Sequence, residues 1–371
     1  MGADRQQTQS RRGPGLLGAP ALDFGVFGEG VAKRERPPLR LRDNHDPKPN
    51  TEAEPHARAY QPFAPATWGG RDALAENALR SLLLAHRPAF RQERTFLRAQ
   101  PLLFGHLFSF ARRTLTQAFV ALGLTEHDDW SAFYRLFGAP RIDYGKLTGC
   151  FFEETLPHMP ASEPYVAVVD GMHLPRSSHK MPGTSWLKAP RTPPFRPGIH
   201  RAQRFLHLAA LLPKSEEGYS RALPLRLEPA FPEKAVAAEG FEPKKQWEAA
   251  LEGVWWLRES LDAAGREGQR LLVVGDGDFS VAEFRAQLPP PERVVLFTRC
   301  AKNRALYELP GPELEKRRGR RRKYGDRVRR PEEWLAERDG WRGRELLVRG
   351  RRILTRFRVE GPFVLKRRSL T

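Results

Sequence analysis

Cysteine is scarce in this chain, and its scarcity argues against small folds that are stabilised by disulfides or by zinc. Cys150 and Cys300 are the only cysteines among 371 residues, and neither has partner ligands at metal-binding spacing. The sequence therefore supports neither a disulfide framework nor a zinc finger. Cys150 is expected to lie in a core.

Long apolar runs are also missing. No stretch approaches the roughly 20 apolar residues that are needed to cross a bilayer. The first twelve residues lack the apolar centre of a signal peptide. We therefore expect a soluble, cytoplasmic protein without a membrane partner.

Acidic residues are too few to balance the basic ones. The chain has 63 Lys and Arg residues against 44 Asp and Glu residues, which gives a formal net charge of +19. Because counterion release from phosphates drives binding to such a surface, a nucleic acid is the expected partner. The length allows two or three domains with a sizeable core.

Periodic apolar residues are absent from residues 1–58, for which we expect a disordered arm without assigned chemistry. Residues 71–157, in contrast, carry apolar side chains at spacings of three and four, which predicts helices, with Gly123 ending one of them. Residues 112–137 fit either a helix-turn-helix that enters a DNA groove or part of a simple helical bundle.

Two short β-branched runs each end in an aspartate. Residues 165–170 and 271–276 are typical of buried strands, and they deliver Asp170 and Asp276 to a sheet edge, where active sites collect. Two carboxylates there can hold divalent cations about 4 Å apart and polarise a phosphodiester. Asp278 competes for the second position. Asp-Gly is also a common turn after a strand, so either aspartate alone is weak evidence.

The region after Asp170 predicts a loop followed by further α/β elements. Residues 171–204 are rich in Pro, Gly, His, Lys and Arg, which suits a loop lying along phosphates. His173 and His179 in this loop are most simply surface residues. The later predicted elements are strands over 205–212 and 223–227, a helix over 246–264 with core tryptophans, a strand over 271–275, a helix over 279–288 and a strand over 293–298. We thus expect an α/β fold with a mixed five-stranded sheet.

This order of strands and aspartates resembles the ribonuclease H-like core of metal-dependent polynucleotidyl transferases. Over about residues 75–365 the chain is similar to insertion-sequence transposases of the DDE class, and the order of several blocks carries the resemblance. The blocks are RQERTF, RRTLTQAFVALGL, DWSAFYRLF, VVDGMHLPRSSHKMPGTSW, RAQRFLHLAALLP, LLVVGDGDFS, RCAKNRALYELP and GRRRKYGDRVRRPEEW. The implied parts are a disordered arm (1–58), a helical DNA-binding-type domain (71–157), a ribonuclease H-like catalytic core (163–300) and a basic segment with an incomplete β-rich insertion (301–371).

The resemblance implies that Asp170 and Asp276 are catalytic and bind Mg²⁺ or Mn²⁺. In that family these aspartates activate water or a strand-end hydroxyl for attack on a phosphodiester. Asp276 is preferred to Asp278 because the family block reads Gly-Asp-Gly at the strand end, and Asp278 remains a candidate metal ligand. The implied partners are double-stranded DNA and transposon ends, with homodimerisation on DNA left open.

The third carboxylate of the family, a glutamate on a long helix after the fifth strand, has no counterpart. Residues 343–368 instead alternate apolar and basic side chains in a strand-like way. Glu333, Glu337 and Glu360 are the remaining substitutes, and none stands in the family position. The sequence resembles a transposase cut short, expected to be inactive, and the third acid stays unknown.

A basic run over residues 316–330 is the candidate for contact with the DNA backbone. Such contacts set affinity and salt dependence without setting sequence choice. The run also fits a solvated segment without a specific role. Its candidate DNA-binding residues are Lys316, Arg317, Arg318, Arg320, Arg321, Arg322, Lys323, Arg329 and Arg330.

Three functional interpretations therefore remain. The first is a DDE transposase with a metal-dependent strand-transfer core. The second is a non-catalytic DNA-binding product of the same lineage. The third is an unrelated metal-dependent phosphohydrolase that uses Asp170, Asp276 and Asp278.

Overall fold

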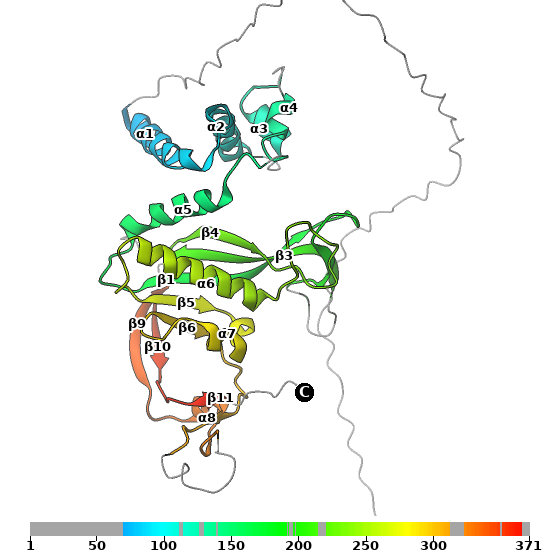
Figure 1. Ribbon diagram of the computed structural model, residues 1–371. Helices are drawn as coiled ribbons and strands as arrows, with labels where there is room; N and C mark the ends of the chain where they lie inside the picture. The colour runs from blue at the N-terminus through cyan, green and yellow to red at the C-terminus, as the bar shows by residue number, and fades with distance from the viewer. Residues whose placement is uncertain are drawn as a thin grey trace, which may run out of the picture. The chain divides into compact units, whose positions relative to one another are not determined.

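The computed structural model describes residues 70–110, 114–125, 130–138, 140–190, 192, 196, 198–213, 220–311, 323–348 and 351–365 (Figure 1). The arm expected over residues 1–58 lies outside these ranges. Within them, no helix combines the length and the apolar character needed to span a bilayer.

Helices occupy the first part of the described chain, as the spacing of apolar residues predicts. A small core forms where α2, α3 and the segment around α4 meet, with Leu102, Phe119 and Phe133 buried together. The helices are α1 (Gly70–Ala85), α2 (Glu93–Phe108), α3 (Leu115–Ala121), α4 (Trp130–Tyr134) and α5 (Tyr144–Thr155).

Gly123 ends α3, as predicted. Its φ of 67° lies in the left-handed region that favours glycine. The Gly123 N–H donates to the carbonyl of Val120 at 3.1 Å and the Leu124 N–H to that of Phe119 at 2.9 Å, which together form a Schellman motif. Residues 111–113 and 126–129 lie outside the described ranges, so the helix-turn-helix interpretation stays a prediction.

A six-stranded mixed sheet follows, consistent with a ribonuclease H-like fold. Its order is β2-β3-β1-β5-β6, and β4 pairs with β3 beside β2 on the edge away from β1. β5 runs parallel to both β1 and β6, and the other pairs are antiparallel. The strands are β1 (Tyr165–Pro175), β2 (Thr184–Lys188), β3 (Ile199–Leu211), β4 (Ala222–Pro229), β5 (Leu271–Gly275) and β6 (Val294–Thr298).

The prediction of a loop over residues 171–204 is wrong for much of that range. The sheet also has six strands, whereas five were predicted. β1 continues to Pro175, β2 forms within the supposed loop, and β3 begins at Ile199. The reason is backbone pairing: β3 offers partners to β1 as far as Ala202 and to β2 from Ile199 to Gln203. Ladder hydrogen bonds satisfy the peptide groups there, although Pro, His and Arg side chains hide any strand pattern.

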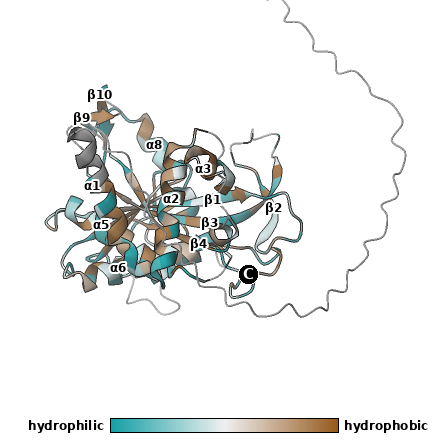
Figure 2. Ribbon diagram, turned by 90° about the horizontal axis from the view of Figure 1, so that it is seen from above, coloured by the Kyte–Doolittle hydropathy of each residue, from teal (hydrophilic) through white to brown (hydrophobic). Residues whose placement is uncertain are grey.

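The main core lies between one face of this sheet and α6 (Gln246–Ala263). Val169 of β1, Leu208 of β3 and Val273 of β5 are buried with Val254 and Leu257 of the helix. Trp247 and Trp256 are partly buried and pack against the same cluster, as expected, whereas Trp255 is exposed. Figure 2 shows hydrophobic and hydrophilic stretches alternating along α6, as expected for a helix with one buried face.

Smaller elements complete the described chain. The strand-like character predicted for residues 343–368 is confirmed where β9 pairs with β10 and where β11 joins β7 and β8 in a three-stranded sheet, while residues 349–350 and 366–368 lie outside the described ranges. The remaining elements are the short helical turn η3 (Gly277–Phe279), α7 (Ala282–Gln287), β7 (Leu306–Tyr307), β8 (Arg327–Val328), α8 (Pro331–Ala336), β9 (Arg342–Val348), β10 (Arg351–Phe357) and β11 (Val364–Leu365).

A buried arginine fastens the end of α6 to the strands. Arg258 has no exposed surface, and its guanidinium donates to Asp262 at 2.9 Å and to the carbonyls of Arg266 and Gln269 at 2.8 and 2.5 Å. Asp262 also accepts a hydrogen bond from Arg293, just before β6. Burial raises the pKa of Asp262, but the Arg293 hydrogen bond and the Arg258 charge outweigh it and hold that pKa below its ordinary value.

Replacing Asp262 with Ala is expected to lower the free energy of unfolding by about 2–3 kcal/mol at neutral pH, because the buried Arg258 loses its counter-charge. Since the pKa of Asp262 is depressed in the folded state, this contribution is complete above the ordinary Asp value. It is lost as the pH falls through the depressed one. Urea unfolding of both proteins across acidic and neutral pH measures it.

The matched control is Glu259→Ala, at an exposed position of the same helix. It should change stability by no more than about 0.5 kcal/mol. An equal loss in both variants would contradict the role given to Asp262.

Candidate active site

Asp170 is an exposed carboxylate in an otherwise buried stretch of β1. Its neighbours Ala167 and Val169 have no more than 1% of their surface exposed. The last parallel pair between β1 and β5 joins Val169 to Gly275, and from Asp170 onward β1 pairs with β3 alone. The prediction that the strand ends at Asp170 is therefore wrong, but the pairing of β1 with β5 does end just before this residue.

Asp276 directly follows the last residue of β5, as predicted. Its Oδ1 accepts the N–H of Asp278 at 2.9 Å and caps the short turn η3. Among the described residues, no other hydrogen bond reaches this carboxylate. Asp276 and Asp278 are both exposed, and Asp278 lies within η3.

Strand register brings the backbones of the two leading candidates together. Because Val169 and Gly275 are register partners, Asp170 and Asp276 are the next residues on adjacent parallel strands. Neighbouring strands lie about 4.8 Å apart, so the backbones of the two aspartates lie close together, as a shared cation site requires. The expected adjacency of these strands is confirmed, while the chemical roles of the aspartates stay predictions.

His207 is a neighbour of Asp170 that the sequence did not reveal. It lies directly opposite Asp170 in the antiparallel β1–β3 pair and is half-buried. Residues opposite one another in such a pair share a face of the sheet. Only the strand register identifies His207. In the sequence it stands in an apolar run, which does not indicate a functional residue.

The two histidines expected on the surface differ from one another. His179 is exposed, and its carbonyl accepts from Arg201. His173 is a half-buried residue of β1 whose Nδ1 lies 3.0 Å from Nε2 of His200. Burial, followed by the neighbouring His200 and Arg204, lowers the pKa of His173, so this ring favours its neutral form. Successive side chains of a strand point to opposite faces of the sheet. His173 comes three residues after Asp170 and therefore lies on the opposite face.

The glutamates considered for the third acid are engaged elsewhere. Glu333 accepts the N–H of Arg330 at 2.8 Å and caps α8, Glu337 pairs with Arg329 and Arg358, and Glu360 pairs with Arg358. In the part of the chain that the structure describes, no three His, Cys, Asp or Glu residues are grouped so as to hold a metal ion. The third acid therefore stays unidentified.

The basic run is only partly described. Lys316, Arg317, Arg318, Arg320, Arg321 and Arg322 lie outside the described residues. Lys323 is exposed, whereas Arg329 forms an ion pair with Glu337 and Arg330 lies 3.4 Å from Glu332. At its described end, the run thus contributes to local ion pairs, and its DNA-binding role stays a prediction.

Gly275 allows the close approach of β5 and β1 just before Asp276. A Cβ added there would lie 2.9 Å from Cδ2 of Phe279 and 3.0 Å from Cγ2 of Val169. Both neighbours are buried core side chains with little room to move. Glycine at this position therefore fixes the spacing on which the two aspartates depend.

Replacing Gly275 with Ala is expected to lower the free energy of unfolding by about 1–3 kcal/mol through overpacking. Gly277→Ala is the matched control, because its added Cβ would meet only the carbonyl of Arg299, at 3.9 Å. Thermal denaturation of the two variants compares them directly. Equal midpoints would show that the β1–β5 contact does not require glycine.

Comparison with known protein families gives a match. The family model described as DDE superfamily endonuclease matches residues 86–355, which include Asp170, Asp276 and the whole sheet. Comparison with curated proteins gives no match. The family match confirms the DDE class predicted from the sequence blocks, while the expectation that the chain is cut short stays a prediction. The chain belongs to the DDE superfamily endonucleases.

Proposed function

We propose that this protein is a DNA transposase by lineage, whose core binds a divalent cation through Asp170 and Asp276. One observation carries the proposal: two exposed aspartates follow a register pair of adjacent parallel strands, at the same edge of the sheet. Family membership supplies DNA as the substrate class. Cleavage and strand transfer at insertion-sequence ends are the reaction we assign to this lineage.

The donor set fits a hard cation. Mg²⁺ and Mn²⁺ prefer oxygen ligands, and Mg²⁺ is commonly held by one or two carboxylates together with waters and substrate phosphates. Asp170 offers an exposed carboxylate, and Asp276 keeps one oxygen beyond its bond to the Asp278 N–H. A cation held there would polarise a phosphodiester and stabilise charge on its oxygens. Asp278 remains an additional candidate ligand.

Residues next to the two aspartates shape this edge of the sheet. The Asp278 N–H fixes one oxygen of Asp276, and Gly275 sets the distance between β5 and β1. His207, opposite Asp170, is placed to accept or donate a hydrogen bond beside that carboxylate. The Asp278 N–H orders Asp276, and the close β1–β5 contact orders the backbone at both aspartates before any cation binds, which lowers the cost of ordering them.

We also propose that the 371-residue polypeptide binds DNA without cutting it. Two carboxylates leave a second cation under-coordinated, and Glu333, Glu337 and Glu360 are committed to partners around α8 and β10. The protein would then be a DNA-binding product of the transposase lineage. Family membership favours either form of that lineage over an unrelated phosphohydrolase. A cytoplasmic location, transposon ends as partners and homodimerisation on DNA remain predictions.

Metal binding tests the site directly. Asp170→Asn and Asp276→Asn should each weaken Mn²⁺ binding by at least about tenfold. Replacing a residue that only orients a metal ligand already has an effect of this size, and replacing the ligand itself should weaken binding at least as much. Electron paramagnetic resonance of free Mn²⁺ gives the affinity. Glu267→Gln is the control, because this exposed acid precedes β5 at the opposite end of the strand. Undiminished binding by the double Asp variant would overturn the metal site.

Nicking of supercoiled DNA tests the proposed inactivity. The purified chain should leave the plasmid intact in Mg²⁺ or Mn²⁺, because among the described residues no third acid joins Asp170 and Asp276. The Asp170→Ala and Asp276→Ala proteins, prepared identically, reveal any contaminating nuclease. Nicking that disappears in both variants would contradict the proposal and direct the search for a third acid to Glu333, Glu337 and Glu360.

A further inference from the structure

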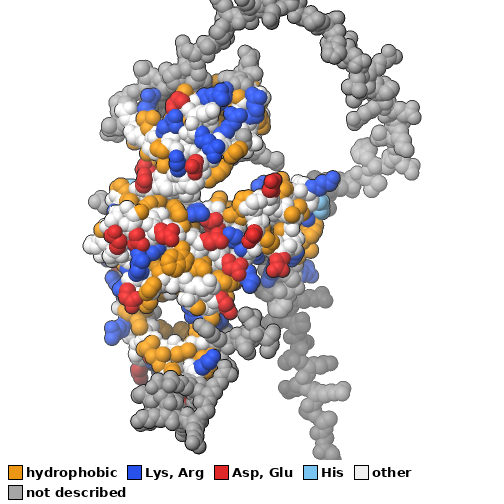
Figure 3. Space-filling view, in the orientation of Figure 1, with side chains coloured by type: hydrophobic (Ala, Val, Ile, Leu, Met, Phe, Trp, Pro, Cys, Tyr) orange, Lys and Arg blue, Asp and Glu red, His pale blue; other side chains and the backbone are white. Residues whose placement is uncertain are grey.

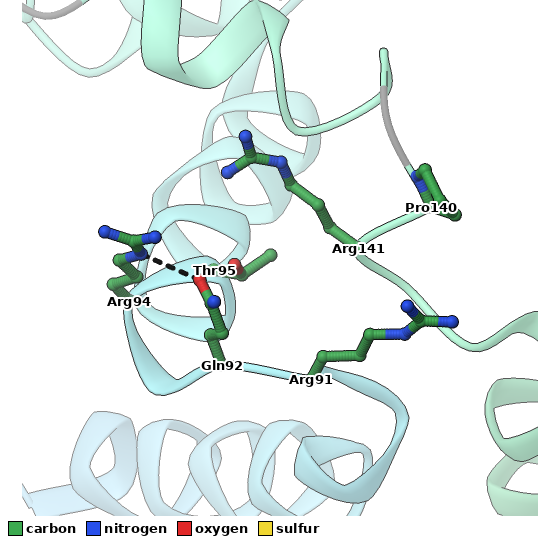
Figure 4. Close-up of a pocket in the computed structure, with 6 residues that line it drawn as sticks. All are labelled: Arg91, Gln92, Arg94, Thr95, Pro140 and Arg141. Atoms are coloured by element: carbon green, nitrogen blue, oxygen red, sulfur yellow. Dashed lines mark hydrogen bonds between the residues drawn. The ribbon is translucent and has the colours of Figure 1, made fainter.

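A cationic cavity lies in the helical part of the chain, outside the sheet that carries the aspartates. Its volume is about 300 Å³, at the small end of the range of ligand pockets. The residues that line it are Arg91, Gln92, Arg94, Thr95, Pro140 and Arg141, and none of them is acidic (Figure 4).

Backbone contacts hold the two walls of this cavity together. One wall leads into α2 and the other precedes α5. An isolated bridge pairs Phe90 with Ile142, the Arg91 N–H donates to the carbonyl of Arg141 at 3.3 Å, and the Asp143 N–H donates to that of Ala89 at 2.8 Å. The cavity is therefore built from ordered backbone before any ligand enters, which reduces the entropic cost of binding.

The arginines of the cavity have no carboxylate partners among the described residues. Arg94 donates to the side-chain oxygen of Gln92 at 2.8 Å, a neutral acceptor. Arg141 is half-buried, and no ion pair reaches it or Arg91 within the described chain. Figure 4 shows the three arginine side chains extending to different sides of the hollow, and Arg91 and Arg94 are exposed, so each is free to turn toward an anion bound there.

The start of α2 adds to the attraction. Gln92 is the N-cap residue, yet its side chain makes no capping hydrogen bond and turns instead to Arg94. A helix N-terminus carries partial positive charge and N–H groups that suit an anion. The acid nearest this end, Glu93, is paired with Arg87 and does not line the cavity.

We propose that this arginine cavity, formed by Arg91, Arg94 and Arg141, receives a backbone phosphate of DNA. Arginine suits this ligand because its planar fork donates two parallel hydrogen bonds to phosphate oxygens. Figure 3 shows Lys and Arg side chains gathered over the helical part of the chain, and a DNA backbone can follow such a basic surface. The inference rests on the proposed function for its choice of DNA.

The test measures binding of the full chain to a short duplex DNA, with fluorescence anisotropy as the readout, at several salt concentrations. Changing Arg91, Arg94 and Arg141 together to Gln should weaken binding by about tenfold. It should also make the slope of log affinity against log salt shallower by about 0.9 for the phosphate that is no longer neutralised. Changing the same three residues to Lys should keep the slope and lose part of the affinity, because Lys keeps the charge without the fork.

A matched control removes three charges from exposed positions of the same helical part, by Arg80→Gln, Arg135→Gln and Lys146→Gln. A smaller loss of affinity in the control supports the cavity. Equal losses in the two triple variants, or no loss in either, would overturn it, as would a Lys variant with the shallower slope of the Gln variant.

Mn²⁺ binding separates this inference from the proposed function. The cavity variants should bind Mn²⁺ as the unchanged protein does, since Asp170 and Asp276 are intact. Unchanged DNA binding by the Gln variant, with an intact metal site, would overturn the cavity alone. Failure of the unchanged protein to bind duplex DNA would overturn both.

Discussion

The pairing of β1 with two different neighbours is the constraint on which the candidate active site depends. β3 holds β1 along nearly its whole length, whereas β5 holds it only as far as the pair of Val169 and Gly275. Beyond that pair the two strands offer Asp170 and Asp276 at one edge. Gly275 makes the arrangement feasible, because a side chain there would collide with Val169 and Phe279. The buried face under α6 keeps this register, since a slip of one residue would turn every apolar side chain of β1 away from the core.

The large positive charge of the chain has more than one use. Arg258 and Arg266 donate to backbone carbonyls at the base of the sheet, and Arg204 does the same for the segment between β4 and α6. Arg329 and Arg358 pair with glutamates near α8. These arginines stabilise the fold, so a net charge of +19 overstates the charge that is free to meet DNA. The cavity at the start of α2 differs because its arginines face no carboxylate among the described residues.

Local sequence predicted those elements that are marked by a continuous apolar run, by a regular apolar spacing or by a glycine that a turn requires. Residues 271–275 form β5 as expected, and the helix expected over 246–264 is α6 with an end one residue earlier. Gly123 ends α3 because a left-handed residue is needed there, a demand that glycine meets locally. The region after Asp170 escaped prediction because its strands follow from pairing with β3, and its Pro, His and Arg residues carry no period.

The sequence by itself determined the charge of the protein, the presence of two aspartates after β-branched runs and the order of elements that points to the DDE class. Those features are local, or depend only on the order of segments along the chain. The tertiary structure alone decided that His207 lies opposite Asp170, that Glu337 pairs with Arg358, and that Arg91, Arg94 and Arg141 line one cavity. Each of these depends on residues far apart in the chain, whose separation in space is set by strand register and helix packing and leaves no periodic trace in the sequence.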